Sequence, residues 1–132
     1  MNWDILLDAF TGEVAAMPAV VALAGEAVRY GGEVEHEVPS CVIRMISDTE
    51  SELWAPVTVQ VDLFHKSAAV VLTAERALRR RYHADLPIPI GNLNAWAQYS
   101  DGTVTASPER DGYFGRALRF TFTPLRAAYS GG

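Results

Sequence analysis

The strongest constraint on the fold of this chain is a nine-residue segment, residues 57–65, in which apolar and polar side chains alternate. The two kinds fall on opposite sides of an extended strand: Val57, Val59, Val61 and Leu63 against Thr58, Gln60 and Asp62. Such a strand is half-buried, as in an antiparallel sheet covered on one face. An apolar run at residues 41–46 precedes it after a short polar connection, so antiparallel pairing of these two strands is the simplest topology.

The first 25 residues have the spacing of helices. Apolar residues recur at intervals of four, four and three, which places them on one face of a helix: Leu6, Phe10, Val14 and Met17. Pro18 should end this helix or open a second short one, and Gly25 is a natural C-terminal cap.

A further helix should follow the alternating strand directly, with Ser67 as its N-cap and its end near His83. Helical spacing puts four residues on its buried side: Val71, Ala74, Leu78 and Tyr82. Glu75 and Arg79 lie four residues apart, which predicts a modest surface ion pair.

The rest of the chain predicts two more strands. Residues 93–105 form the first, with a bend or bulge near Asp101, and residues 116–123 form the second. Pro87 and Pro89 impose an extended connection before them. The fold class is therefore α+β, with an antiparallel sheet of about four strands and helices packed on one face. We expect a single domain over residues 1–126 and a mobile tail over 127–132.

Composition agrees with one globular domain. The 132 residues suffice for a single core, and 49% hydrophobic against 20% charged residues excludes a disordered chain. Cys41 is the only cysteine, so neither an internal disulfide nor a cysteine-rich zinc site is possible. The longest apolar stretch is broken by Pro18 and follows no positively charged start, which argues against a membrane anchor or signal peptide. We expect a soluble protein of a reducing compartment.

Charge is unevenly distributed along the chain. The net charge of −5 argues against a dedicated nucleic-acid binder. Residues 26–52 hold seven acids against two arginines, whereas residues 66–81 hold five bases against one acid. An acidic and a basic region on one small domain suit head-to-tail association of identical copies. They also suit an ordinary solvated surface.

No catalytic, cofactor or metal site is predicted. The three histidines, His36, His65 and His83, have no metal-ligand spacing, and Cys41 lies among apolar neighbours that favour a buried, inert thiol. Alternating glutamates at 33, 35 and 37 are more typical of an edge that resists aggregation than of an ion site. Since no nucleotide-binding or nucleophile motif is present, we expect a protein that is not an enzyme.

Binding and assembly remain as functions. Large aromatic residues beside loops or on a polar strand face are either covered by a helix or held against another subunit. We therefore name a set of candidate subunit or partner contacts from the two charged regions and these aromatics: Glu33, Glu35, Glu37, Trp54, Arg76, Arg79, Arg80, Trp96, Tyr113 and Phe114.

The layout of the chain resembles the tail terminator, or tail completion, family of long-tailed bacteriophages and phage-derived gene transfer agents. The resemblance covers about residues 5–124. It lies in the helical start, then in four stretches: residues 27–30 (Ala-Val-Arg-Tyr), 38–43 (Val-Pro-Ser-Cys-Val-Ile), 57–64 with the helix after Ser67, and 111–120. The chain departs from the family at Ser40 and Cys41, where members often carry an aromatic residue after the proline.

The resemblance implies a structural virion protein at the head–tail junction, assembled in the cytoplasm of the bacterial host. Its partners would be copies of itself in a ring, usually of six, the tail tube protein on one side and a head completion or connector protein on the other. DNA would pass through the ring without specific binding, as suits an acidic protein. Two alternatives stay open, namely a neighbouring head–tail connector (adaptor or stopper) and a small-molecule-binding α+β domain.

Overall fold

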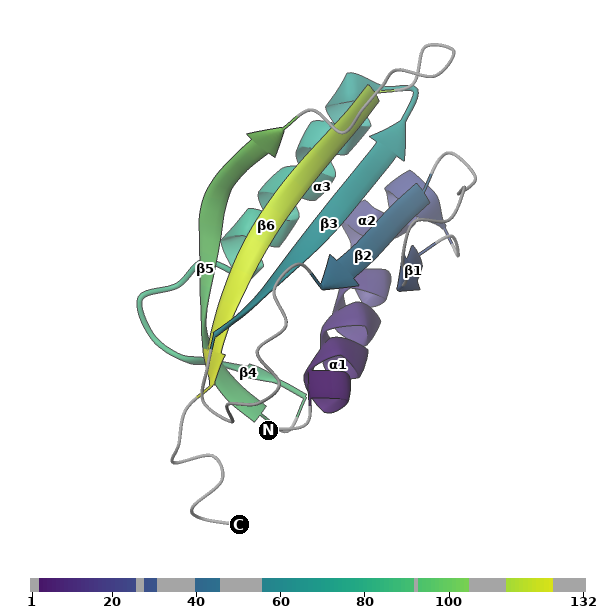
Figure 1. Cartoon of the computed structure of the whole chain (residues 1–132). Helices are drawn as coiled ribbons and strands as arrows, with labels where there is room; N and C mark the ends of the chain where they lie inside the picture. The colour runs from purple at the N-terminus through teal and green to yellow at the C-terminus, as the bar shows by residue number, and fades with distance from the viewer. Residues whose placement is uncertain are drawn as a thin grey trace.

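The alternating segment forms β3 (Val57–His65), a central strand of the sheet. The computed structural model describes residues 3–25, 28–30, 40–45, 56–91, 93–104 and 114–124. Within this part of the chain the strands lie in the order β1-β2-β3-β6-β5-β4 (Figure 1). Their bounds are β1 Val28–Tyr30, β2 Ser40–Met45, β4 Ile88–Ile90, β5 Leu93–Val104 and β6 Phe114–Pro124.

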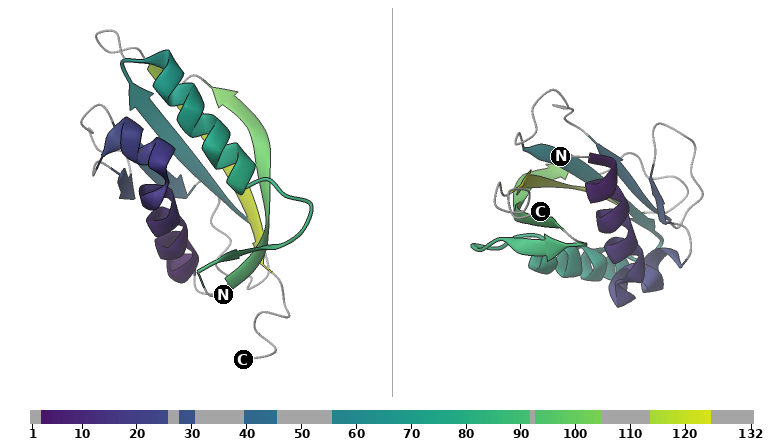
Figure 2. Two further views of the ribbon diagram at one scale, coloured as in Figure 1. Left: turned by 180° about the vertical axis from the view of Figure 1, so that it is seen from behind. Right: turned by 90° about the horizontal axis from the view of Figure 1, so that it is seen from below.

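Three helices cover one face of this sheet: α1 (Trp3–Ala16), α2 (Pro18–Ala24) and α3 (Ala68–Arg81). Figure 2 shows them together in front of the strands when the molecule is seen from behind, and none of the described helices lies on the other face. Helix α3 packs against β3 and β6, and α2 packs against α3 and β2. The prediction of an α+β domain with helices on one face is confirmed.

The helix boundaries follow from local chemistry. Pro18 lies in the first turn of α2, where a backbone N–H would have no hydrogen-bond partner within the helix, so the lack of one in proline costs no hydrogen bond. Gly25 ends that helix at a φ of 58°. The Ser67 hydroxyl accepts a hydrogen bond from the Val70 N–H at 3.4 Å and caps α3. Both the break at Pro18 and the Ser67 cap were predicted.

The core lies between the sheet and the helices. The four alternating apolar residues of β3 are fully buried, and so are Leu6, Phe10 and Val14 of α1 and the four residues predicted on the inward side of the third helix. Met17, predicted on the same face as the α1 residues, follows the end of α1 and is only partly buried against the core. Four aromatic rings from three distant parts of the chain meet there. Phe10 lies 4.7 Å from Tyr82 and 5.2 Å from Phe122 between ring centroids, and Tyr82 lies 5.8 Å from Phe120.

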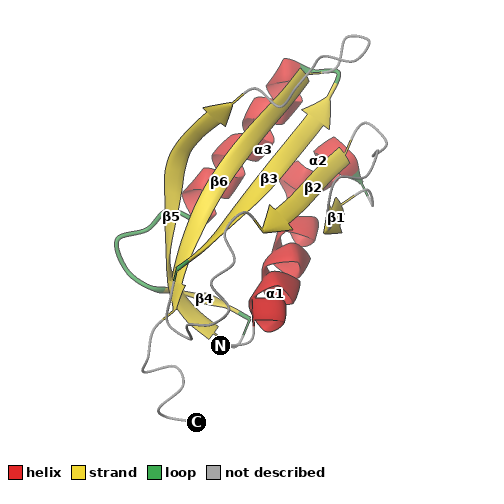
Figure 3. Ribbon diagram, viewed as in Figure 1, coloured by secondary structure: helices red, strands yellow, loops and turns green. Residues whose placement is uncertain are grey.

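The sheet is larger than predicted: it has six strands, not about four (Figure 3). The five strands from β2 to β4 in the sheet order pair antiparallel, and β1 pairs parallel with β2. The two extra strands, β1 and β4, have three residues each, too few for an alternating pattern to appear in the sequence. The predicted irregularity in β5 is confirmed by a register shift between Ser100 and Val104.

Among the described residues, no single helix is long and apolar enough to cross a membrane. Residues Leu6–Ala16 and Pro18–Ala24 reach that length and composition only as a pair, across a 79° bend. The tail predicted at residues 127–132 lies outside the described residues.

Replacing Phe10 by alanine should destabilise the fold, since Phe10 is fully buried and contacts the rings of Tyr82 and Phe122. Loss of a buried phenylalanine costs about 3–5 kcal/mol. Leu86→Ala is the control, because Leu86 is 74% exposed and should change the unfolding free energy by no more than about 0.5 kcal/mol. Urea unfolding of both variants measures this, and similar losses in the two would contradict the proposed core.

Candidate functional site

The outward side of α3 carries an apolar residue followed by two cations. Leu72, Arg76 and Arg80 are spaced four residues apart, so successive side chains lie on the same side of the helix. All three are exposed. Arg76 and Arg80 make no hydrogen bond or ion pair with any described residue, which leaves two guanidinium groups free for a partner.

The other two arginines of this region are engaged within the fold. Arg79 Nη1 donates to Glu75 Oε2 at 3.4 Å, and its guanidinium carbon lies 4.5 Å from the centre of the Tyr99 ring. Arg81 Nη2 donates to Glu13 Oε1 at 3.2 Å and to the carbonyl of Pro89 at 2.7 Å. The three consecutive arginines therefore point to different surroundings, as their helical positions predict, and only Arg80 remains unpaired.

A shallow apolar hollow lies beside the first turns of α3. Its volume is about 240 Å³, and it is lined by Ala68, Val71, Leu72, Phe114, Gly115 and Arg116. Leu72 is 41% exposed and Phe114 is 50% exposed. Two large, partly exposed apolar side chains that line one hollow form a surface on which an apolar side chain of a partner can be buried.

Glu75 corrects a prediction from the sequence. The expected modest surface pair with Arg79 is instead part of a buried cluster, since Glu75 is only 4% exposed. Arg116 on β6 holds both carboxylate oxygens, with Nε donating to Oε1 at 2.9 Å and Nη2 to Oε2 at 3.0 Å. The bidentate pair fastens α3 to the sheet. Arg116 is far from Glu75 in sequence, so no local spacing indicates it.

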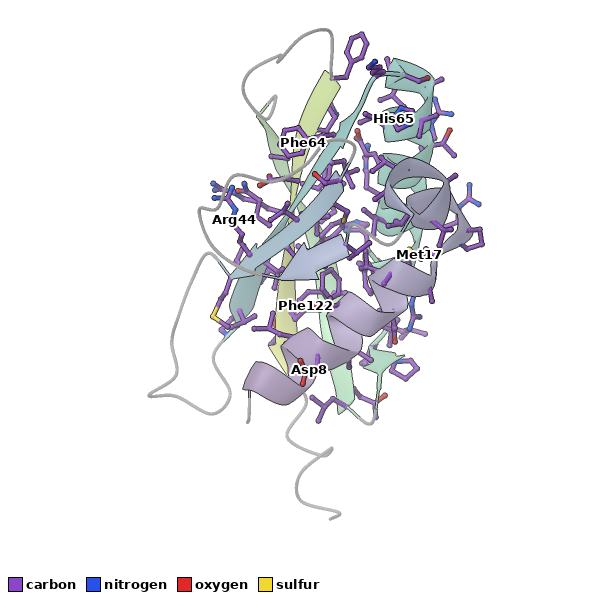
Figure 4. All side chains as sticks on the ribbon, turned by 90° about the vertical axis from the view of Figure 1, so that its right-hand side faces the viewer. Asp8, Met17, Arg44, Phe64, His65 and Phe122 are labelled. Atoms are coloured by element: carbon purple, nitrogen blue, oxygen red, sulfur yellow. The ribbon has the colours of Figure 1, made fainter. Side chains whose placement is uncertain are left out.

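The face of the sheet opposite the helices carries a network of polar side chains. Arg44 lies on this side and Phe122 on the side of the helices in Figure 4. Arg44 Nη2 donates to Asp62 Oδ2 at 2.8 Å, Gln60 Nε2 donates to Asp62 Oδ1 at 2.8 Å, and Arg119 Nε donates to Gln60 Oε1 at 3.0 Å. These bonds link β2, β3 and β6 across the sheet. Gln60 and Asp62 are both buried, so the network satisfies polar groups that the fold removes from water.

Cys41, His65 and His83, whose side chains could take part in catalysis, are each buried or hydrogen-bonded within the fold. Cys41 is fully buried, and burial raises the pKa of its thiol from 9.0 to about 12, with Asp62 adding to the shift. Nδ1 of His65 accepts the N–H of Ser67 at 2.9 Å, and Nδ1 of His83 accepts the N–H of Tyr99 at 3.0 Å. Within the described part of the chain, no three side chains of the types that bind metals gather at one point.

The structure separates the predicted contact residues into two surfaces. Arg76 and Arg80 lie on the outward side of α3 and Phe114 lines the hollow beside its first turns, whereas Arg79 is half-exposed and held by Glu75. Trp96 is 42% exposed and alternates with buried Ala95 and Ala97, which places it on the face opposite the helices instead. The alternative that Trp96 belongs to the core is therefore excluded. Five predicted residues lie outside the described residues: Glu33, Glu35, Glu37, Trp54 and Tyr113.

Sequence reasoning missed the hollow. Leu72 was not singled out, although an apolar residue on the polar side of a predicted amphipathic helix is the signal that could have identified it. The contribution of β6 to the hollow depends on tertiary packing and leaves no such signal.

Comparison with known proteins shows a similarity of fold to a solved structure. No protein-family model matches the chain, and no curated protein matches it in sequence. The fold is similar to that of a chain in a solved structure described as the virion of a native gene transfer agent particle. The TM-score is 0.54 and the identity 12%, and the match covers 86% of this chain and 90% of that chain. The similarity therefore concerns the arrangement of the whole domain.

Cys41→Ala should flatten the dependence of stability on pH above 9. The unfolded chain loses the thiol proton from about pH 9, whereas the folded chain keeps it up to a pKa of about 12. In this window the thiol makes unfolding easier by up to about 1.4 kcal/mol per pH unit, and its stabilising contribution is fully present only below pH 9. Urea unfolding of both chains across this range measures the difference. Parallel pH curves would contradict the burial of Cys41.

Arg116→Met should destabilise the fold because it leaves the Glu75 carboxylate buried with only the longer contact to Arg79. Breaking one partner of a buried ion pair costs about 3–5 kcal/mol, and the remaining contact puts this loss at the lower end. Arg76→Met is the matched control, since Arg76 is exposed and its loss should cost no more than about 0.5 kcal/mol. Equal unfolding midpoints for the two variants would refute a structural role for the pair.

Proposed function

We propose that this chain is a structural protein of a phage-like virion and acts as a tail terminator. In this role copies of the chain form a ring that caps the tail tube, stops its polymerisation and provides the surface for head–tail joining. The observation that carries the proposal is the fold similarity to a chain of a gene transfer agent virion, which extends over most of both chains.

Two further observations support the same function. The resemblance of residues 5–124 to tail terminators rests on sequence alone, and it indicates the same kind of particle as the fold similarity. The charged regions also suit a ring, because neighbouring subunits of a ring meet through two different surfaces. An acidic surface on one copy can then meet a basic surface on the next.

The partners follow from this function. They are further copies of the chain in a ring of six, the tail tube protein on one side and a head completion or connector protein on the other. DNA passes through the ring without specific binding, and its repulsion by a protein of net charge −5 assists passage. The chain performs no enzymatic reaction in this role. It resides in the virion at the head–tail junction after assembly in the host cytoplasm.

The test is the length of tails in particles made without this gene, measured by electron microscopy. A tail terminator is expected to leave overlong tails without heads when it is absent, because nothing stops addition of tube subunits. Supplying the wild-type gene from a plasmid should restore the normal length, and this serves as the control.

Two results would overturn the terminator role. Tails of normal length that fail to join heads would assign the chain to the connector instead. If particles made without the gene are normal and infectious, the chain has no role in the tail.

A further inference from the structure

Among the described residues, the large apolar side chain most exposed to solvent is that of Leu86, at 74%. It lies in the connection between α3 and β4, residues 82–87, which stands out from the body of the domain as the green segment at the left of Figure 3. Asp85 precedes it, is also exposed, and makes no hydrogen bond or ion pair with any described residue. The connection therefore presents an apolar side chain directly beside an unpaired carboxylate.

The hollow beside the first turns of α3 can accept such a side chain. Its volume is about 240 Å³ and its lining is largely apolar. An apolar cavity of about 150 Å³ already holds a benzene ring, which is larger than the isobutyl group of leucine. Leu72 and Phe114 are partly exposed in the hollow, so filling it removes apolar surface of both partners from water.

Arg76 adds a complementary charge beside the hollow. It follows Leu72 by one turn on the outward side of α3, about 6 Å along the axis at a rise of about 1.5 Å per residue. The acid of the same helix, Glu75, is already held by Arg116 and Arg79. A carboxylate that arrives next to an apolar group in the hollow therefore meets an unpaired cation.

One copy of the chain cannot bring these two features together. The hollow lies beside the first turns of α3 and the connection follows its last residue, and the helix between them is about 20 Å long. The contact must therefore form between copies. Because its two sides differ, each copy can offer one side to one neighbour and the other side to the next, which is the arrangement that a ring requires.

We propose that Leu86 of one copy enters the hollow beside α3 of the next copy, where Asp85 pairs with Arg76. The inference rests on the ring-forming function proposed above, and it names a contact from which the ring is built. Leu86 supplies most of the affinity, because it is the group that leaves water. The charge pair determines the direction in which the connection enters the hollow.

Crosslinking between two variants of the full chain tests the contact directly. One variant carries Ala84→Cys in the connection, and the other carries Ala68→Cys in the lining of the hollow. Cys41 is fully buried, so each variant offers one accessible thiol to a short bismaleimide. A mixture of the two should give a covalent dimer, whereas neither variant alone should give one.

A second pair of variants provides the matched control. Ala16→Cys replaces the lining thiol by one at the end of α1, which is exposed and does not line the hollow. Adding Leu86→Asp to the Ala84→Cys chain should lower the yield of dimer with Ala68→Cys at least about tenfold, because the apolar group is lost. Equal yields with Ala68→Cys and Ala16→Cys, or a yield that does not depend on Leu86, overturn the proposal.

Charge reversal tests the ion pair. Arg76→Asp and Asp85→Arg, each introduced into both crosslinking chains, should lower the yield about fivefold, because like charges then face each other. Chains that carry both changes should regain the yield, since the pair is restored with its signs exchanged. Arg80→Asp is the control: it changes the net charge equally but lies a further turn from the hollow. Double variants that do no better than the single ones overturn the pairing, and thermal unfolding checks that each variant folds.

These results are separable from the tail-length experiment, because crosslinking needs only the purified chain. A Leu86→Asp chain that crosslinks as well as before and restores tail length in particles lacking the gene overturns the contact and leaves the terminator role standing. A dimer that depends on Leu86, together with normal tails in particles lacking the gene, supports the contact and overturns the terminator role.

Discussion

The packing of Phe10, Tyr82 and Phe122 holds the two layers of this domain together. The three rings come from α1, the residue after α3 and β6, and each is fully buried. The Tyr82 hydroxyl donates to Glu13 at 2.8 Å, so burial of the ring is combined with a satisfied polar group. Because α3 is fastened at this end by Tyr82 and near its middle by the pair of Glu75 with Arg116, its rotation about its own axis is determined.

This fixed rotation decides which side chains reach the surface. The inward side of α3 contributes Val71, Ala74 and Leu78 to the core. Glu75 is held at the sheet by Arg116 and also pairs with Arg79, whose side chain stays half-exposed. Leu72, Arg76 and Arg80 remain outward as a consequence. The candidate contact surface therefore consists of the α3 side chains that take no part in packing the helix against the sheet.

The sequence predicted those parts of the fold that repeat over several residues. The alternation in β3 and the helical spacing in α3 each involve many positions, so the boundaries and the buried faces were predicted closely. Strands β1 and β4 have three residues each and form only because longer strands offer them edges, which no local pattern reveals. Glu75 was predicted at the surface for the same reason: its main partner, Arg116, lies on a strand far along the chain. Of the candidate contact residues, Arg76 and Arg80 lie on the outward side of α3, and Phe114 lines the hollow beside its first turns, which required the packing of β6 against α3.

The same short strands bear on how copies of this domain can associate. A sheet with long open edges can add further strands without limit, whereas β1 and β4, which end this sheet, offer three residues each. Pro89 in β4 also lacks the N–H that a further strand would need. Addition of a further strand at either of these described edges is therefore disfavoured. A contact through two different surfaces closes into a ring or continues as a filament according to the rotation it imposes. A protein that stops the growth of a tube needs the closed form, so the rotation between neighbouring copies is the quantity on which the proposed function depends.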